Sequence, residues 1–199
     1  MDLVFATNNI HKLKEIRSIL GPAFNLQGLM ETGIREEIPE DYETLEENAS
    51  QKAWVIFNKV RKNCMADDTG LEVESLGGAP GVFSARYSRI GVPVYTEFDV
   101  AEANIRKLLD QLRDQPHRRA RFRTVIALVL EGREYRFEGI AEGAITDAPR
   151  GREGFGYDPV FIPEGYEQTF AEMDPALKNR ISHRAKAVTG LVQFLKRHS

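Results

Sequence analysis

The stretch CMADDTG (residues 64–70) places two acidic side chains directly after a short apolar run. The apolar residues 64–66 predict a buried strand, and the acids, hydroxyl and glycine that follow indicate where this strand leaves the core. Adjacent side chains on an extended strand point to opposite faces. We therefore expect Asp67 and Asp68 to have different roles, unless the chain has already turned at Asp67.

Helical and strand-like patterns precede this stretch. Residues 3–6 form an apolar run typical of a buried strand, and an amphipathic helix follows until Gly21 and Pro22 close it. The acidic segment 35–41 is expected to be an irregular loop. Apolar residues recur at helical spacing from about Thr44 to Val60, which predicts a second helix that leads into the CMADDTG stretch.

The pattern after this stretch mixes strands with helices. The expected elements are a short strand at 71–73, a glycine-dense loop at 77–81, a helix at 101–112, a hairpin of strands 120–130 and 134–141, a strand at 160–162, and a final helix N-capped by Ser182. This order predicts an α/β protein whose sheet carries antiparallel pairs, rather than a purely parallel doubly wound sheet.

Composition limits the classes of protein to consider. With 199 residues and 42% hydrophobic content, we expect a single domain at 1–199, or two lobes that share a core. A net charge of −3 argues against binding to a nucleic-acid polymer or an anionic membrane. The single cysteine, Cys64, is expected to be buried and inert and excludes an internal disulfide. Without a signal peptide or transmembrane run, the protein is expected to be soluble and cytoplasmic.

The segment TNNIHK (residues 7–12) lies between the first strand and the first helix. Backbone N–H groups, the helix dipole and the side chain of Lys12 can converge there on one anion, and phosphate is the natural candidate. The alternative is an ordinary helix start, with Asn8 or Asn9 as the N-cap and Lys12 in solvent. The segment is not a Walker P-loop, which requires GxxxxGK[ST].

Three further segments carry possible ligand-binding groups, each with a plain structural alternative. Asn48 and Lys52 share one face of the second helix and can meet the same phosphate chain, unless that face is merely solvated. In the loop 151–159, glycines allow close approach and two aromatic rings offer stacking faces, while Asp158 can accept from a base N–H. The alternative is a tight loop whose aromatic side chains fill the core.

Lys178 and the run Ser182-His183-Arg184 place two cations and an imidazole near a helix start, where they can donate to an oxygen-rich ligand. The alternative is a capped helix with basic residues on its surface. Arg119, Arg121 and Arg123 alternate with apolar residues along a strand, which indicates a solvated sheet face.

Taken together and in this order, the motifs TNNIHK, ENASQKA, MADDTGLEVESLGGAPGVFSARYS, REGFGYDP and ISHRAKA resemble the inosine/xanthosine triphosphate pyrophosphatases, from Leu3 to about Leu195. The resemblance implies a two-lobed α/β fold on a long mixed β-sheet flanked by helices, with the nucleotide in a cleft between the lobes. It also implies a homodimer that uses Mg2+ to hydrolyse ITP, dITP and XTP to the monophosphate and pyrophosphate.

The resemblance assigns roles to individual residues. For the triphosphate it implies Thr7, Asn8, Asn9, Ile10, His11, Lys12, Asn48, Lys52 and Thr69, with serine the commoner residue at the last position. For the nucleobase it implies Phe155, Gly156, Tyr157, Asp158, Lys178, His183 and Arg184. For the metal it implies Asp68, which also acts as the proton acceptor, and Glu40. A shift of the motif by one residue would place Pro39 at the position of this glutamate. The family usually has glycine where this chain has Asn8 and His11.

These roles sharpen the division between the two adjacent acids. Asp68 is assigned to the metal and the attacking water, and Asp67 to the local turn or to the support of a neighbouring group. Lys178 and Arg184 are the candidate donors to a 6-oxo group, because an amino group at that position would leave such donors unpaired.

Three other functions compete with this assignment. A pyrophosphatase of modified pyrimidine or methylated nucleotides would share the fold but lack the FGYD and SHR motifs. A non-catalytic nucleotide-binding protein would gain little from an extra carboxylate at Asp68 facing phosphates. A phosphoaspartate phosphatase needs a second aspartate two residues after the nucleophile, and that position is Gly70.

Overall fold

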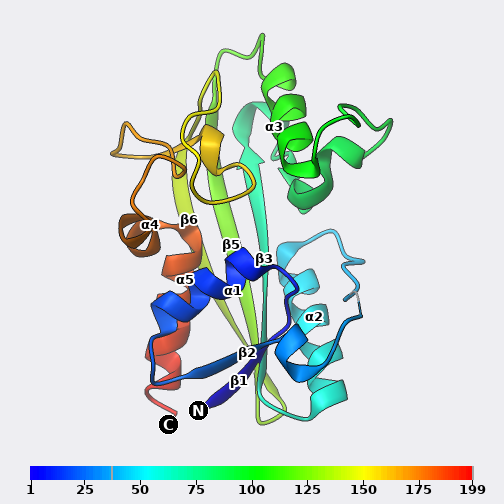
Figure 1. Cartoon of the computed structure of the whole chain (residues 1–199), viewed down its shortest axis with the longest axis vertical. Helices are drawn as coiled ribbons and strands as arrows, with labels where there is room; N and C mark the ends of the chain where they lie inside the picture. Colours follow the sequence, from blue (N-terminus) through cyan, green and yellow to red (C-terminus); the bar gives the residue numbers. More distant parts are fainter. Residues whose placement is uncertain (37, 199) are drawn as a thin grey trace. The chain divides into compact units, whose positions relative to one another are not determined.

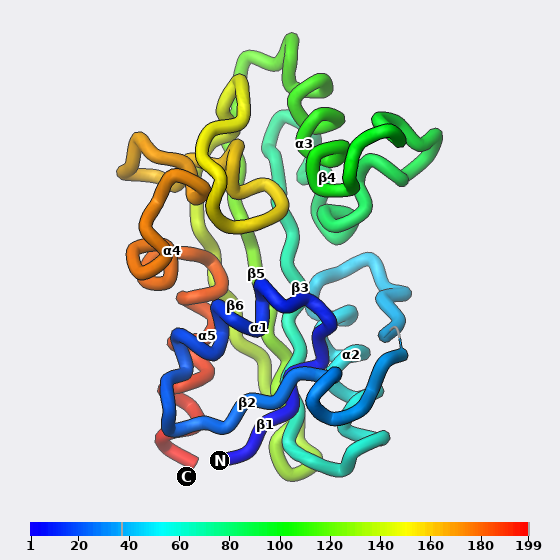
Figure 2. The backbone as a smooth tube through the Cα atoms, viewed as in Figure 1, coloured from blue at the N-terminus to red at the C-terminus, as the bar shows by residue number. Residues whose placement is uncertain are grey.

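The computed structural model describes residues 1–36 and 38–198, and Figure 2 traces the backbone. The chain divides into two compact units. The first contains residues 1–68, 124–139 and the chain from Ser182 onward, and the second contains residues 69–123 and 140–181. As expected, 35–36 and 38–41 have no helix or strand, and Glu37 lies outside the described residues.

Seven strands form one mixed sheet in the order β2-β1-β3-β5-β6-β7, with β4 paired to β3. The strands are β1 (Asp2–Phe5), β2 (Asn25–Gly28), β3 (Cys64–Val73), β4 (Pro80–Gly81), β5 (Arg119–Leu130), β6 (Arg133–Ile145) and β7 (Phe161–Pro163). Strand β1 runs parallel to β2 and β3, whereas the β3–β4 and β6–β7 pairs are antiparallel. The expected α/β class with a mixed sheet is therefore confirmed.

Within the described residues, five α-helices accompany the strands, and Figure 1 shows their arrangement. They are α1 (Ile10–Leu20), α2 (Leu45–Val60), α3 (Val100–Gln111), α4 (Pro175–Ile181) and α5 (His183–Leu195). Short 3₁₀ turns occur at η1 (Leu29–Thr32), η2 (Glu74–Leu76), η3 (Ser84–Arg89) and η4 (Asp158–Val160).

In the first unit, helices cover both faces of the sheet. Strand alternation places Leu3 and Phe5 of β1 and Met65 of β3 in one apolar core, together with Ile16 of α1 and Leu191 of α5. Figure 1 shows α1 and α5 together on this side of the strands and α2 on the other. Successive residues of β3 therefore face different helices.

The helix starts follow the capping residues in the sequence. Thr44 caps α2 by accepting from the backbone N–H of Glu47 at 3.2 Å, and Ser182 caps α5 by accepting from Ala185 at 3.1 Å. Gly21 ends α1 with a φ of 71°, a conformation that glycine adopts readily. These expected helix boundaries are confirmed.

The second unit has its own aromatic core. The ring centroid of Phe161 lies 4.7 Å from that of Phe122 and 5.2 Å from that of Phe170. Leu108 of α3 and Val73 at the end of β3 are fully buried in the same cluster. Tyr157 of the FGYD motif belongs to the same core.

The expected hairpin is confirmed, and its turn is tight. Glu131 and Gly132 alone separate β5 from β6, and both have positive φ values, 50° and 78°. A two-residue turn with both central residues in the left-handed region matches the natural twist of paired strands. Strand β6 continues four residues beyond the expected end at residue 141.

Some expected boundaries were wrong. The segment 71–73 is not a separate strand, because β3 runs without interruption from Cys64 to Val73. The glycine-dense loop contains a two-residue strand, β4, which pairs with Leu71 and Glu72. Val160 ends a 3₁₀ turn, so that β7 begins at Phe161. Strand β2 and helix α4 were not expected.

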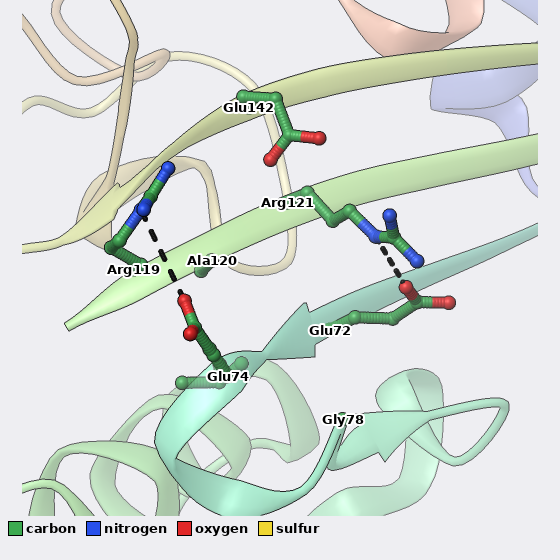
Figure 3. Close-up of a pocket in the computed structure, with 8 residues that line it drawn as sticks. Glu72, Glu74, Gly78, Arg119, Ala120, Arg121 and Glu142 are labelled. Carbon is green, nitrogen blue, oxygen red and sulfur yellow. Dashed lines mark hydrogen bonds and ion pairs between the residues drawn. The ribbon is translucent and has the colours of Figure 1, made fainter. Parts of the chain in front are cut away.

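The arginine-rich part of β5 forms a solvated face, as expected. Arg121 pairs with Glu72 at 2.7 Å and Arg119 approaches Glu74 at 4.0 Å. Figure 3 shows these pairs lining a cavity of about 330 Å3 together with Glu142. Exposed ion pairs contribute little to stability, and charges of both signs alternate on this surface.

The absence of a transmembrane run and the burial of Cys64 were also expected from the sequence. Within residues 1–36 and 38–198, no helix is both long enough and apolar enough to span a bilayer. Cys64 is a buried free thiol, and burial raises its pKa to about 12. The expected burial of Cys64 is therefore confirmed, and its inertness stays a prediction, which the scarcity of the reactive thiolate at neutral pH supports.

Candidate active site

The segment from Thr7 to Lys12 starts helix α1. Asn9 is the N-cap, and its side-chain oxygen accepts from the backbone N–H groups of His11 at 2.9 Å and Lys12 at 3.2 Å. The hydroxyl of Thr7 accepts from the N–H of Asn9 at 3.1 Å. The capping alternative is thus correct for Asn9, but Lys12 is not left in solvent.

Lys12 belongs to a buried group of charges around Asp67. The ammonium of Lys12 donates to Asp67 Oδ1 at 3.0 Å, and Arg184 Nε donates to Asp67 Oδ2 at 3.3 Å. Arg184, at the start of α5, also pairs with Glu15 of α1. The side chain of Asp67 is 1% exposed and that of Arg184 is 2% exposed. Asp67 therefore joins α1 and α5 through two cations.

Asp68 belongs to a second group on the other face of β3. Lys52 of α2 donates to Asp68 Oδ1 at 2.9 Å and to Glu40 Oε1 at 2.7 Å. Both carboxylates thus lie within hydrogen-bond distance of one nitrogen. The structure thus brings Asp68 and Glu40, the two residues assigned to the metal from sequence, onto one lysine side chain.

The two adjacent carboxyls have pKa shifts of opposite sign. Burial acts to raise the pKa of Asp67, but Lys12, Arg184 and Lys52 together hold that pKa well below its ordinary value. Burial also dominates at Asp68, where it raises the pKa despite the nearby Lys52 and Lys12. Asp67 is therefore a permanently ionised partner of cations, and Asp68 is the more basic carboxylate.

Asn48, which was expected from the sequence to meet a phosphate, binds the backbone of Tyr42 in this structure. Its side-chain oxygen accepts from the backbone N–H of Tyr42 at 2.9 Å, and its amide nitrogen donates to the carbonyl of Tyr42 at 3.0 Å. Asn48 is only 1% exposed. In this structure its side chain fastens the segment before α2.

In the second unit, the FGYD motif and Lys178 form a third group. Asp158 Oδ2 accepts from Lys178 Nζ at 2.7 Å and from the backbone N–H of Phe155 at 2.8 Å. Lys178 Nζ also lies 5.2 Å from the ring centroid of Phe155. A Cβ at Gly154 would lie 2.1 Å from Asp158 Oδ2, so the loop requires glycine there.

The other expected site residues differ in exposure. At the start of α1, the side chains of Asn8, Ile10 and His11 are exposed. Thr69 follows Asp68 in β3, Gly156 is half-buried next to Phe155, and His183 is buried at the start of α5. Tyr157 packs in the aromatic core, and its hydroxyl donates to the carbonyl of Ser84 at 3.0 Å. The core-filling alternative therefore describes Tyr157, while Phe155 is the half-buried ring of the loop.

The sequence reasoning missed Glu15, which pairs with Arg184 and thereby joins the group around Asp67. A signal was available, because Glu15 lies three residues after Lys12 and so shares its face of the helix. The pairing with Arg184, 169 residues away, could not be read from the sequence.

The carboxylates fit a hard divalent cation only in part. Among the described residues, no group of three or more acidic, histidine or cysteine side chains is arranged to hold a metal. Asp68 and Glu40 do provide two carboxylates close together, and both accept from Lys52 Nζ in this structure. Mg2+ is commonly bound by one or two carboxylates, with water and substrate phosphates completing its coordination, so these two residues suit it.

Known proteins resemble this chain over nearly its whole length. A family model described as the Ham1 family matches residues 3–194. A dITP/XTP pyrophosphatase of Porphyromonas gingivalis is 54% identical over 194 residues, which are 97% of this chain and 96% of that protein. A dITP/XTP pyrophosphatase of Bacillus subtilis is 42% identical over 199 residues, covering 98% of this chain and 97% of the relative.

The same class of fold is found among solved structures. The structure of the Staphylococcus aureus Ham1 protein matches with a TM-score of 0.86 and 35% identity, and the match covers 100% of both chains. The chain therefore belongs to the Ham1 family. This confirms the resemblance that the five sequence motifs indicated.

Proposed function

We propose that this chain is a nucleoside triphosphate pyrophosphatase that hydrolyses non-standard purine nucleotides, namely dITP, XTP and ITP, to the monophosphate and pyrophosphate. Membership of the Ham1 family and the similarity to two dITP/XTP pyrophosphatases support the reaction class. The observation that carries the proposal is the pairing of Asp68 and Glu40 with Lys52. The neighbouring Asp67 has its own cations, and its pKa is lowered where that of Asp68 is raised.

Asp68 acts as the general base in this proposal. Its side chain is paired with Lys52 at 2.9 Å on the face of β3 away from Lys12 and Arg184, so the structure gives it a different environment from that of Asp67. Asp67 cannot replace it, because both of its oxygens already accept from Lys12 and Arg184. Two adjacent acids thus have separate tasks, as expected when the pKa values of neighbouring carboxyls are pushed apart.

Lys12 and Lys52 provide the positive charge for the triphosphate. Asp68, Glu40 and Asp67 raise the pKa of Lys52 although burial opposes them, so this lysine stays charged. Lys12 is 17% exposed and projects from the start of α1. Two fixed cations on separate helices suit an extended polyphosphate better than a single anion.

Asp68 and Glu40 would hold the metal ion in this proposal, and Lys52 keeps the two carboxylates together. Mg2+, when bound, would neutralise charge that develops on the leaving pyrophosphate. The fit rests on the two oxygen ligands that lie near one nitrogen, at 2.7 Å and 2.9 Å.

The third group provides selectivity for the base. Lys178 is a donor and Asp158 an acceptor, and hypoxanthine presents the complementary pair of a 6-oxo acceptor and a ring N–H donor. Adenine has the reverse pattern, which would leave buried polar groups unpaired. The half-buried ring of Phe155 offers the stacking face. The assignments of Gly156, Tyr157, His183 and Arg184 to base recognition stay predictions, as do the homodimer and the cytoplasmic location.

Product analysis tests this proposal directly. The protein is incubated with ITP and, separately, ATP in the presence of Mg2+, and the products are separated by ion-exchange chromatography. We expect IMP and pyrophosphate from ITP and much slower turnover of ATP. Release of orthophosphate, or equal use of the two substrates, would overturn the proposal. Inert binding of ITP would instead support the non-catalytic alternative.

A further inference from the structure

The segment before α2 is fastened to that helix by an ordered set of side-chain contacts. Three successive residues of the segment each bind one side chain of α2. The pairs are Glu40 with Lys52, Asp41 with Gln51, and Tyr42 with Asn48. Since this segment has no helix or strand of its own, these contacts fix its path.

Two hydrogen bonds join Asp41 and Gln51. The backbone N–H of Asp41 donates to Gln51 Oε1 at 3.1 Å, and Gln51 Nε2 donates to Asp41 Oδ2 at 2.6 Å. Asn48 binds both the N–H and the carbonyl of Tyr42 in the same two-point manner. On α2, residues three and four apart share a face, so Asn48, Gln51 and Lys52 present one surface to the segment.

We propose that Gln51 and Asn48 are positioning residues that hold the carboxylate of Glu40 beside Asp68. This inference rests on the proposed function, in which Glu40 and Asp68 hold the metal. Glu40 is on an irregular segment and its side chain is 31% exposed, so its position depends on the path of that segment. The two amides restrict the backbone on its carboxyl-terminal side and thereby keep both carboxylates together.

Gln51 gives the clearer test of this proposal. Its bonds with Asp41 are exposed, so their loss has little effect on folding, whereas Asn48 is 1% exposed and its loss would leave buried polar groups without partners. The hydrogen bonds of Gln51 go to Asp41, the neighbour of Glu40 in the segment. Any effect on metal binding therefore has to pass through the segment.

The experiment measures metal binding without turnover. Mn2+ replaces Mg2+, the ligand is an inosine triphosphate with an imido bridge between the α and β phosphorus atoms, and free Mn2+ is followed by electron paramagnetic resonance. For Gln51→Ala we expect about tenfold weaker Mn2+ binding, typical of a lost supporting contact, with an unchanged thermal midpoint. Gln193→Ala, an exposed glutamine on α5, is the matched control and should bind Mn2+ like the wild type.

A reciprocal exchange provides the rescue. In the double variant Gln51→Glu with Asp41→Asn, the new carboxylate can accept from the backbone N–H at 41 and from the new amide, so both bonds are regenerated with the charge moved. We expect this variant to recover most of the Mn2+ affinity. Gln51→Glu alone opposes the carboxylate of Asp41 and should bind Mn2+ more weakly than Gln51→Ala does.

Glu40→Gln distinguishes an error in the positioning role of Gln51 from an error in the proposed metal site. If Glu40→Gln weakens Mn2+ binding but Gln51→Ala does not, the positioning role is wrong while the proposed metal site stands. If Glu40→Gln leaves Mn2+ binding unchanged, the proposed metal site itself is wrong. Weakening in both single variants, with recovery in the exchanged pair, supports the positioning role.

Discussion

Asp67 and Asp68 are neighbours in β3, yet Asp67 lies 3.0 Å from Lys12 of α1 and Asp68 lies 2.9 Å from Lys52 of α2. The alternation of an extended strand accounts for this separation, because α1 and α2 pack on different faces of the sheet. The two acids consequently have separate cations and opposite pKa shifts. One strand position thus stabilises the fold while the next is available for chemistry.

Lys178→Ala should erode the preference for ITP over ATP. Removal of the ammonium takes away the donor proposed for the 6-oxo group, so we expect the ratio of kcat/KM values to fall by about tenfold or more. The ratio is measured on one enzyme sample, which cancels any loss of folded protein caused by leaving Asp158 buried without Lys178. Lys196→Ala, at the exposed end of α5, is the control. An unchanged ratio for Lys178→Ala would count against base recognition by this lysine.

The approach of β6 to α5 at Gly139 predicts a sharp contrast between two glycine substitutions. A Cβ at Gly139 would lie 2.0 Å from the carbonyl oxygen of His183, so Gly139→Ala should destabilise the protein by about 3 kcal/mol. A Cβ at Gly190 would lie 3.6 Å from Phe137, which is ordinary contact. Gly190→Ala should therefore stabilise α5 by about 0.5 kcal/mol. Urea unfolding that gives the two variants equal stability would contradict the packing described.

Glu134 predicts a pH-dependent contribution to stability. It accepts from Ser50, Trp54 and Arg136, each at 2.6 Å. Burial acts to raise its pKa, but these donors hold it below its ordinary value of 4.5. A depressed folded pKa means that the stabilisation is present above the ordinary pKa and is lost as the pH falls through the folded value.

Glu134→Gln should therefore lower the free energy of unfolding by about 1.5 kcal/mol at pH 7, and this difference should shrink as the pH falls below 4.5. Urea unfolding followed by the fluorescence of Trp54, the single tryptophan, gives the comparison. Glu142→Gln, an exposed carboxyl, is the control. A difference that does not change with pH would show that the carboxylate charge of Glu134 is unimportant.

Local patterns predicted much of the fold. Helix α2 was expected from about Thr44 to Val60, and it begins one residue later because Thr44 is its cap. The hairpin and the start of α5 at Ser182 were predicted equally well, since turn residues and caps act over a few neighbouring positions. Strand β2, with the sequence NLQG, was missed because it is short and lacks an alternating pattern.

The continuity of β3 could not be predicted from local sequence. Asp67 and Asp68 are poor strand residues, and the sequence suggested that the strand ended there. The structure extends β3 through both because their charges are paired by residues 55, 117 and 16 positions away in the chain. The same long-range pairing explains why Asp67 supports neighbouring side chains on two helices, the second of the two roles expected for it, rather than a local turn.

A comparison of Asp67→Asn with Asp68→Asn tests most directly whether the two adjacent acids have separate roles. We expect Asp68→Asn to lower kcat for ITP by about a thousandfold with retained nucleotide binding and a nearly unchanged free energy of unfolding. We expect Asp67→Asn to destabilise the protein by about 3 kcal/mol, because Lys12 and Arg184 lose a buried ionic partner. An Asp68→Asn variant that turns over ITP near the wild-type rate would contradict the assignment of the two adjacent acids.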